Sequence, residues 1–406
     1  MTAEWTRRRV LAALLASTGS AVAGSAAADR DVPEASAPPD TTRVPGAPPT
    51  ARGARSPFEA ASRLPAFGAI SVTPLQELHG TITPADLHFE RHHAGIPQID
   101  PARHELLIHG LVERPLKLSL ADLLRLPAVT RICFIECSGN LMVGAGEEST
   151  PQMLHGLTSQ SEWTGVLLST VLREVGVRPG ARWLLAEGAD AAVMTRSIPI
   201  EKALDDAMLA YAQNGEALRP AQGYPLRLLL PGWEGNTSVK WLRRIEVGDR
   251  PFMTREETSK YTEPLRGGRA RQFSFTMDAR SVLTAPTYPA SLEKGWQEIR
   301  GLAWSGRGRI TRVDVSTDGG RRWQPARLLE PVLAKAHTRF ALPWRWDGGG
   351  AELCSRAVDE TGYVQPTRRE LIEARGPGSQ PYHLNPILSW LVEPDGRVIY
   401  KAEPWA

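Results

Sequence analysis

Short apolar runs alternate with helix-like patterns from about residue 58 to residue 275, which predicts a domain of mixed α and β structure. Ser119 precedes the apolar stretch Leu120–Leu124 in the manner of a helix cap, so a helix is predicted to begin there. Further runs are rich in aliphatic residues and bounded by Gly, Pro or polar residues, as strands are. The predicted strands of this part are Glu105–His109, Arg131–Glu136, Pro225–Gly232 and Ser238–Leu242.

The pattern changes at about residue 276. Arg312–Ser316 alternates apolar and polar residues with a period of two, and the turn-forming stretch Thr317–Gly320 follows. Short alternating strands separated by Asp-Gly turns are typical of a β-sandwich. The fold class predicted for the chain is therefore α+β, with a mixed α/β domain over residues 58–275 and a β-sandwich domain over residues 276–406.

The first 28 residues have the pattern of an export signal. Arg7–Arg9 form a twin-arginine pattern, the apolar stretch Ala12–Ala23 follows, and Ala26–Ala28 supply a small-residue cleavage site. The alternative is a disordered basic terminus. Residues 29–57, rich in Pro, Ala, Thr and Arg, are predicted to form a flexible linker. Twin-arginine export generally carries proteins already folded around a cofactor, so the signal indicates a periplasmic protein that holds one.

Composition fits an enzyme-sized chain. Its 406 residues, 42% hydrophobic and 23% charged, are enough for two cores once the predicted signal and linker are set aside. Removing residues 1–28, which hold three Arg and one Glu, leaves 45 basic and 44 acidic residues. A chain so close to neutral lacks the excess of basic residues with which proteins bind nucleic acid or anionic lipid. No later stretch approaches the roughly 18 apolar residues that span a bilayer, so neither nucleic acid nor a membrane is an expected partner.

Cys137 is the most informative single residue. It ends an apolar strand-like run and is followed by Ser138-Gly139-Asn140, a composition that turns the chain and lets backbone approach a bound group. A thiolate presented in this way suits a heavy transition metal. Extended structure disfavours a disulfide to Cys133, because the two would lie roughly 13 Å apart. A structural role for Cys137 stays open, whereas Cys133 and Cys354 are expected to be buried small hydrophobes.

Several short motifs occur in one order along the chain and carry a resemblance to a known family. These motifs are His88–His93 (HFERHH), Glu136–Asn140 (ECSGN), Glu187–Asp190 (EGAD), Gly223–Arg227 (GYPLR), Ser238–Trp241 (SVKW) and Thr258–Thr262 (TSKYT). The chain resembles the molybdopterin-dependent sulfite oxidase family, and within it the periplasmic sulfane/sulfite dehydrogenase subunits. In the second domain Ser316–Trp323 and Ala357–Pro366 look like the immunoglobulin-like dimerisation domain of that family.

The resemblance implies a molybdenum–molybdopterin cofactor (Moco) and assigns residues to it. Cys137 matches the cysteine that ligates molybdenum. The residues matched to catalysis are Arg91, Cys137, Tyr261 and Arg375. The residues matched to cofactor binding are Phe89, Arg91, His93, Cys137, Asp190, Gln222, Arg227, Ser238, Val239 and Lys240. Arg and Lys suit the terminal phosphate of the cofactor, since Arg can donate two parallel hydrogen bonds to a phosphate and Lys adds a positive charge.

Plainer interpretations exist for several of these residues. His88 and His92, four apart, are also the spacing of a helical zinc pair, although Ala94–Pro97 favours a loop. Arg227 and Lys240 could be surface charges at strand ends. An aspartate at position 190 is common in turns. Trp163 is expected to line the same pocket or else to be a core tryptophan.

Two departures from the family bear on the substrate. The sulfite-oxidising members have arginines after the cysteine motif, where this chain has Leu141 and Met142. A sulfite dianion would lose charge-assisted hydrogen bonds there, each worth roughly 1.5 to 3 kcal/mol, whereas a less charged sulfane sulfur on a carrier-protein cysteine would not need them. Gln222 replaces a histidine that often touches the cofactor, which keeps hydrogen bonding and removes a titratable group. Both departures favour protein-bound sulfane sulfur as the substrate.

The activity implied by the resemblance is oxygen-atom transfer to inorganic or carrier-bound sulfur in thiosulfate and sulfur oxidation. The sequence has no cysteine pair with histidine of the c-type haem kind, so a separate c-type cytochrome subunit is expected as electron acceptor, in a heteromeric complex built on a homodimer. Alternatives from other classes are a periplasmic molybdopterin reductase of sulfoxide-type substrates and a metal-free binding or assembly protein.

Overall fold

The computed structural model of the protein describes residues 45–66, 68–142, 144–376 and 382–403. The predicted signal, residues 1–28, lies outside these residues. Met1–Glu59 and Ala60–Ala406 form two separate units. In the first unit, residues 45–59 are exposed and contain neither a helix nor a strand. The predicted domain boundaries at residues 28, 57 and 275 stay predictions.

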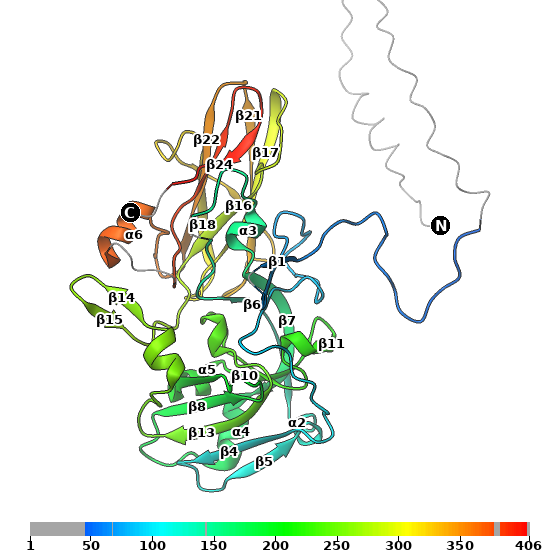
Figure 1. Cartoon of the computed structure of the whole chain (residues 1–406), viewed down its shortest axis with the longest axis vertical. Coiled ribbons are helices and arrows are strands. Elements are labelled where there is room, and N and C mark those ends of the chain that lie inside the picture. Colours follow the sequence, from blue (N-terminus) through cyan, green and yellow to red (C-terminus); the bar gives the residue numbers. More distant parts are fainter. Residues whose placement is uncertain (1–44, 67, 143, 377–381, 404–406) are drawn as a thin grey trace, which may run out of the picture. The chain divides into compact units, whose positions relative to one another are not determined.

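The mixed domain is built on two five-stranded sheets (Figure 1). The strands of the first are β4 (Glu105–Gly110), β5 (Leu116–Ser119), β8 (Trp183–Gly188), β9 (Thr195–Pro199) and β13 (Leu242–Gly248). Their order is β5-β4-β13-β8-β9, and β4 and β13 pair in parallel. The strands of the second are β6 (Ala128–Glu136), β7 (Thr158–Leu167), β10 (Met208–Gln213), β11 (Glu216–Ala217) and β12 (Arg227–Leu229). Here the order is β11-β10-β7-β6, with β12 also paired to β10.

The helices of this domain are short, and α4 (Leu168–Val175) shows how an apolar face packs on the core. This helix buries Leu168, Val171, Leu172 and Val175, an i, i+3, i+4, i+7 stripe that packs into the largest core cluster. It ends at Gly176, whose φ of 65° is the left-handed conformation that glycine adopts most easily. The other helices of the domain are α2 (Leu120–Leu123), α3 (Pro151–His155), α5 (Ile200–Asp205), the 3₁₀ turns η1 (Pro220–Gln222) and η2 (Gly235–Thr237), and the π-helical turn η3 (Glu256–Lys260).

The remaining small elements flank these sheets. Strands β1 (Leu64–Ala66), β2 (Ile70–Val72) and β3 (Glu90–Arg91) form a three-stranded sheet. Strands β14 (Glu263–Leu265) and β15 (Arg269–Arg271) form a hairpin. In Figure 1 this hairpin lies beside helix α6 (Arg368–Arg375), and the backbone N–H of Arg266 donates to the carbonyl of Arg375 at 3.0 Å.

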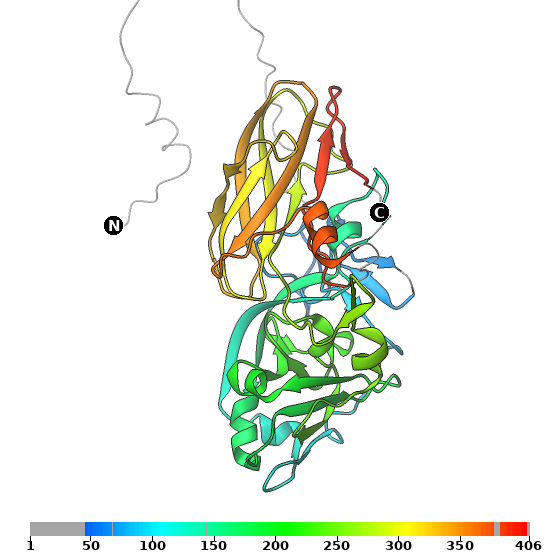
Figure 2. The same ribbon diagram turned by 90° about the vertical axis from the view of Figure 1, so that its left-hand side faces the viewer.

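The second domain is a β-sandwich of two antiparallel sheets, as predicted (Figure 2). One sheet has the order β16-β17-β21-β20 and the other β19-β18-β22-β23-β24. The strands are β16 (Arg280–Ala285), β17 (Gly295–Trp304), β18 (Ile310–Ser316), β19 (Gln324–Pro325), β20 (Arg327–Leu329), β21 (Thr338–Trp346), β22 (Ala351–Asp359), β23 (Ser389–Val392) and β24 (Val398–Tyr400). Alternate residues of both sheets, among them Ile299, Val313 and Phe340, form its core.

Most of the predicted elements are confirmed. Strands occupy the predicted Glu105–His109 and Arg131–Glu136 runs, and Ser119 caps α2 through a capping box with Asp122. The strand predicted over Ser238–Leu242 is wrong, because β13 begins only at Leu242. Trp241 has a φ of 52° and so turns the backbone out of any strand path. The apolar run that resembled a strand is instead a buried loop.

No helix in the part of the chain that the structure describes is long and apolar enough to cross a membrane.

Candidate active site

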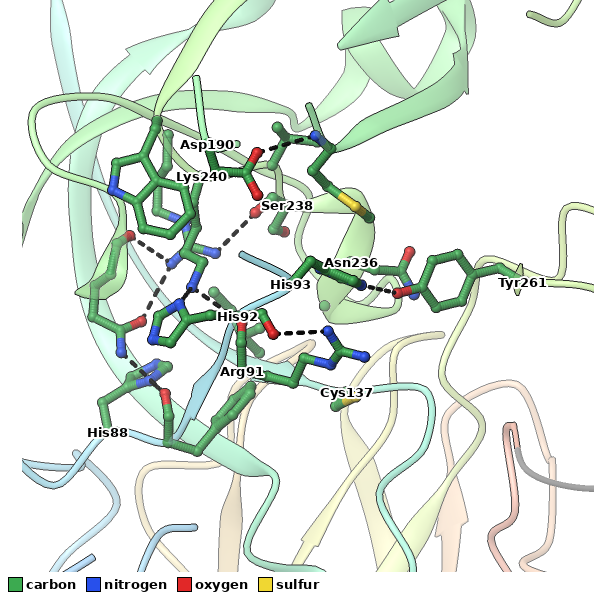
Figure 3. A pocket seen from close by; sticks show the side chains of 18 residues that line it. His88, Arg91, His92, His93, Cys137, Asp190, Asn236, Ser238, Lys240 and Tyr261 are labelled. Carbon is green, nitrogen blue, oxygen red and sulfur yellow. Dashed lines mark hydrogen bonds between the residues drawn. The ribbon is translucent and has the colours of Figure 1, made fainter. Parts of the chain in front are cut away.

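A cavity opens beside the end of β6 (Figure 3). Side chains from six parts of the chain meet there: β3 and its flanks, the loop after β6, the loop after β8, the η1–β12 region, the η2–β13 connection, and the residue after η3. The cavity is lined by His88, Phe89, Arg91, His92, His93, Ile135, Cys137, Asp190, Met194, Gln222, Arg227, Gly235, Asn236, Ser238, Val239, Lys240, Trp241 and Tyr261.

Cys137 lies at the mouth of a tight loop. Strand β6 ends at Glu136, the N–H of Cys137 donates to the carbonyl of Leu157 at 2.9 Å, and the N–H of Asn140 donates back to the carbonyl of Cys137 at 2.9 Å. The thiol is partly buried and is not in a disulfide. The pKa of the thiol is raised, because burial outweighs the N–H of Gly139 and the charge of Arg91, which both lower it. A metal ion would remove this proton, since a coordinating thiol is deprotonated.

Arg91 brings positive charge to the side of the cavity where Cys137 lies. Strand β3 pairs with β2, Ile70 opposite Arg91, which fixes the direction in which this side chain leaves the sheet. Its Nη1 donates to the carbonyl of His92 at 3.0 Å. Figure 3 shows the guanidinium extended beside the Cys137 sulfur. Arg91 is therefore placed to meet an anion that binds near the thiol.

Arg227, on β12, also lines the cavity. Its Nη1 donates to the carbonyl of Gln222 at 3.0 Å and its Nη2 to the carbonyl of Ser238 at 3.0 Å. Gln222 in turn donates from Nε2 to the carbonyl of Phe89 at 3.0 Å. Burial lowers the pKa of Arg227 to about 9. These contacts tie three separate segments around one cation.

The ammonium group of Lys240 is surrounded by hydrogen-bond acceptors of the protein. Its Nζ lies 3.2 Å from the carbonyl of Arg91, 3.0 Å from that of Ala221 and 2.8 Å from Nδ1 of His92. Burial, with Arg227 next, lowers its pKa well below the ordinary value. An ammonium has only three hydrogens to donate. Lys240 thus contributes charge and holds loops together, but has no donor to spare for a ligand.

The positions of Arg227 and Lys240 depend on Gly223. This residue has a φ of 107°, and a Cβ there would lie 3.1 Å from the Cβ atoms of both Arg227 and Lys240. Any side chain at this position would strain the backbone and push the two cations apart. The predicted GYPLR motif thus has a steric reason for its glycine.

Tyr261 closes another side of the cavity. Its hydroxyl lies 3.3 Å from Nε2 of His93, and burial raises its pKa. Burial and Arg91 lower the pKa of His93 to about 4, so this imidazole is neutral at neutral pH. The guanidinium of Arg196, held by buried ion pairs to Glu234 and Glu257, lies 4.8 Å from the centre of the Tyr261 ring. The tyrosine is therefore fixed from behind by a cation–π contact.

The donor set of the cavity fits a molybdopterin cofactor. Arg91, Arg227 and Lys240 give the walls an excess of positive charge, which suits a phosphate. Arg227 Nε, His88 Nε2 and Asn236 Oδ1 are buried and have no hydrogen-bond partner among the described residues. Buried polar groups are normally satisfied, so these atoms indicate that a ligand with several polar groups belongs here. A thiol such as that of Cys137 is the kind of soft ligand that suits a heavy transition metal.

All but one of the site residues predicted from the sequence line this cavity. The exception is Arg375, whose Nη1 donates to the carbonyl of Tyr382 at 3.1 Å and whose Nη2 lies 4.0 Å from Asp278. Its expected role stays a prediction. Trp163 is fully buried in the core, where its Nε1 donates to the carbonyl of Cys133 at 3.3 Å, so the core interpretation holds.

The zinc alternative finds no support in the described residues, where no cluster of three His, Cys, Asp or Glu side chains is placed to hold a metal. His88 and His92 flank a strand instead of a helix, and His92 lies between Lys240 and Glu90. Leu141 and Met142 line a separate apolar hollow behind the Cys137 loop and not the cavity itself.

The sequence did not reveal how the Cys137 loop is held. The carboxylate of Glu136, fully buried, accepts from Asn140 Nδ2 at 2.9 Å and from Trp304 Nε1 at 2.6 Å, and lies 3.0 Å from Arg280 Nη1. Arg280 also donates to the carbonyl of Asn140. Trp304 and Arg280 belong to the sandwich, so we call this set, Glu136, Asn140, Arg280 and Trp304, the carboxylate clamp. The sequence offered one signal, an acidic residue directly before Cys137 at the end of an apolar run.

A second contact from the sandwich side reaches the same loop. The N–H of His383 donates to the carbonyl of Ser138 at 2.8 Å, and its ring Nε2 lies 3.2 Å from Glu234 Oε2. Asn236 donates to both Glu234, at 2.9 Å, and the Ser138 hydroxyl, at 3.3 Å. Burial alone would raise the pKa of Glu234, but Arg196 and His383 outweigh it and hold that pKa at about 2. Charged pairs therefore flank the thiol loop on two sides.

Comparisons with known proteins agree with this arrangement. Residues 93–256 match the family described as "Oxidoreductase molybdopterin binding domain", and residues 271–389 match "Mo-co oxidoreductase dimerisation domain". The crystal structure of the sulfane dehydrogenase SoxCD from Paracoccus pantotrophus is similar, with a TM-score of 0.81 and 45% identity over 90% of this chain and 99% of that one.

Curated relatives include the sulfite oxidase of Gallus gallus, 34% identical over 70% of this chain and 68% of its own length. The NADH nitrate reductase of Ulva prolifera is 31% identical over 71% of this chain, but this chain spans only 38% of that longer protein. The match to a dimerisation domain agrees with the sandwich fold of the second domain. The cysteine loop, the cationic cavity and these matches together show that the chain is a molybdopterin oxidoreductase that belongs to the sulfite oxidase family.

Proposed function

We propose that this protein is a periplasmic sulfane dehydrogenase. In this proposal it oxidises sulfane sulfur carried on a cysteine of a carrier protein and passes the electrons to a separate c-type cytochrome subunit, as a homodimer within a heteromeric complex. Its likeness to the sulfane dehydrogenase SoxCD, at 45% identity, supports the reaction class. The predicted twin-arginine signal supports the periplasm.

The observation that carries the substrate proposal is the charge around Cys137. Arg91 acts on the thiol as a cation, while Glu136 and Glu234 act on it as anions. The positions after Asn140 hold Leu141 and Met142, which turn away into an apolar hollow. Both carboxylates are already paired with buried cations, so Arg91 is the cation near the thiol that is left to meet a free sulfite dianion. A terminal sulfane sulfur carries less charge and needs less compensation.

The proposed roles of the chain's own residues follow from their positions. Cys137 is the metal ligand, and Lys240 lies behind the rest of the cofactor and holds the loops around it. The residues that contact the rest of the cofactor are Phe89, His93, Asp190, Gln222, Arg227, Ser238 and Val239. When bound, the cofactor supplies two-electron redox chemistry and the transfer of an oxygen atom from water to sulfur. Arg91 steadies negative charge that develops on the oxidised sulfur group. Tyr261, held by His93 and Arg196, orients the reacting groups and keeps their positions fixed.

The test compares two substrates with the purified complex. Cytochrome reduction is measured with free sulfite and with a carrier protein whose cysteine bears a sulfane sulfur. We expect a higher kcat/KM with the loaded carrier, and no activity with the same carrier after its cysteine is changed to serine. Turnover of free sulfite at full rate without any carrier would refute the substrate proposal.

A further inference from the structure

His88 lines the cavity, yet one of its ring nitrogens has no hydrogen-bond partner among the described residues. The side chain is only 1% exposed, with its ring stacked 5.2 Å from that of Phe89 and edge-on to Trp163 at 5.8 Å. Its Nε2 is buried and has no hydrogen-bond partner in the described part of the chain. A buried nitrogen of this kind normally has a partner.

The other ring nitrogen fixes what Nε2 can do. Nδ1 lies 3.0 Å from the carbonyl of Phe89, and because a carbonyl oxygen can only accept, Nδ1 carries the hydrogen. Burial, with Arg227 and Lys240 adding to it, lowers the pKa of His88 to about 3, so the ring is neutral at neutral pH. Nε2 therefore carries no hydrogen and can only accept a hydrogen bond.

An unsatisfied donor lies against the same tryptophan. The Nε of Arg227 is buried and without a partner among the described residues, and its guanidinium lies 5.0 Å from the centre of the Trp163 ring. His88 and Arg227 thus both line the cavity and both contact Trp163, and among the described residues the first has an unused acceptor and the second an unused donor. A ligand that satisfies both must carry an N–H or O–H donor and an acceptor.

The cofactor has one part that meets this need. Its phosphate at neutral pH and its dithiolene sulfurs are acceptors, whereas the pterin heterocycle carries ring N–H and amino groups next to ring nitrogens and a carbonyl. We propose that His88 Nε2 accepts a hydrogen bond from an N–H of the pterin ring, while Arg227 Nε–H donates to an acceptor of the same ring. His88 is then a cofactor-binding residue that sets the orientation of the heterocycle. This inference rests on the proposed placement of the cofactor in this cavity.

The test uses variants that differ in where they place an acceptor. The carbonyl of His88→Gln reaches about as far as Nε2, that of His88→Asn falls short, and His88→Phe has no acceptor but keeps a ring. Each full-length variant is purified from cells that make the cofactor and from cells that do not. The measurements are molybdenum and released molybdopterin per chain after gel filtration, and the melting temperature of both forms.

We expect His88→Phe and His88→Asn to lose the cofactor about tenfold more readily than the wild type, and to gain less in melting temperature from it. His88→Gln should keep most of both. Without cofactor, His88→Phe should melt close to the wild type, because it removes an unsatisfied buried nitrogen along with the Nδ1 hydrogen bond, and the Phe89 carbonyl keeps its bond from Gln222.

Equal cofactor retention in the Gln, Asn and wild-type proteins would overturn the inference, and would mean that a buried water satisfies Nε2. Should His88→Phe fail to fold, the comparison of Gln with Asn still decides. If the wild type itself gains no thermal stability from the cofactor, the proposed cofactor placement fails; if it gains and the variants match it, only the role of His88 fails.

Discussion

Breaking the carboxylate clamp should destabilise the protein and loosen its metal site together. The perturbation is Arg280→Met, which keeps the length of the side chain but removes the cation 3.0 Å from Glu136. Both side chains are buried, with exposed fractions of 2% and 0%. Arg280 also donates to the carbonyls of Asn140 and Leu384, which would lose their partner.

The expected size follows from burial. Removing one partner of a buried ion pair leaves the other charge uncompensated and costs about 3–5 kcal/mol. Glu136 keeps its hydrogen bonds from Asn140 and Trp304, so the lower part of this range, about 3 kcal/mol, is expected. The double variant Glu136→Leu/Arg280→Met should lose less than the sum of the two single variants, because it removes both charges.

The assay is equilibrium unfolding in denaturant, with the molybdenum content of each purified variant measured alongside. A matched control is Arg397→Met, which breaks an exposed ion pair of the same domain, 2.7 Å from Asp395, and should leave the free energy of unfolding unchanged. If Arg280→Met unfolds at the same denaturant concentration as this control and retains full molybdenum, the clamp does not hold the thiol loop.

Three further predictions concern the site. Cys137→Ser should abolish turnover and molybdenum binding while the far-ultraviolet circular dichroism spectrum stays as in the wild type; full activity would remove Cys137 from the metal site. Tyr261→Phe should lower kcat about 10²-fold with little change in molybdenum content, and an unchanged kcat would contradict an orienting role. Burial alone would lower the pKa of His383, but Glu234 outweighs it and the pKa is raised, so its charged form stabilises the fold below pH 6.5 and that stability is lost as pH rises through the raised pKa. His383→Gln should therefore flatten the fall of melting temperature on the alkaline side, and an identical pH profile would disprove the pairing.

The motifs of the site could be predicted from sequence because they are local. Each short motif, such as ECSGN or GYPLR, carries its own turn chemistry, and the fold brings them to one cavity. Arg375 was matched through the second domain with little local pattern around it, and it lies outside the cavity lining. Ser238–Leu242 misled the strand prediction because a buried loop can be as apolar as a strand.

Contacts between segments far apart in the chain could not be predicted from the sequence. Glu136 and Trp304 are far apart in the chain, and nothing in the local pattern of either predicts their hydrogen bond of 2.6 Å. Likewise, the sequence predicted charge from Lys240 but not that all of its hydrogens are used by the protein. Such contacts depend on how helices and strands pack in space. No local sequence pattern indicates which two distant side chains will meet.

The carboxylate clamp has a consequence for biosynthesis. Arg280 and Trp304 leave the ribosome long after Glu136 and Cys137, so a nascent chain that contains the complete first set of motifs still lacks the groups that pin their loop. We therefore expect the thiol to reach its final position, and the metal to be loaded, only after the C-terminal half has been translated and has folded.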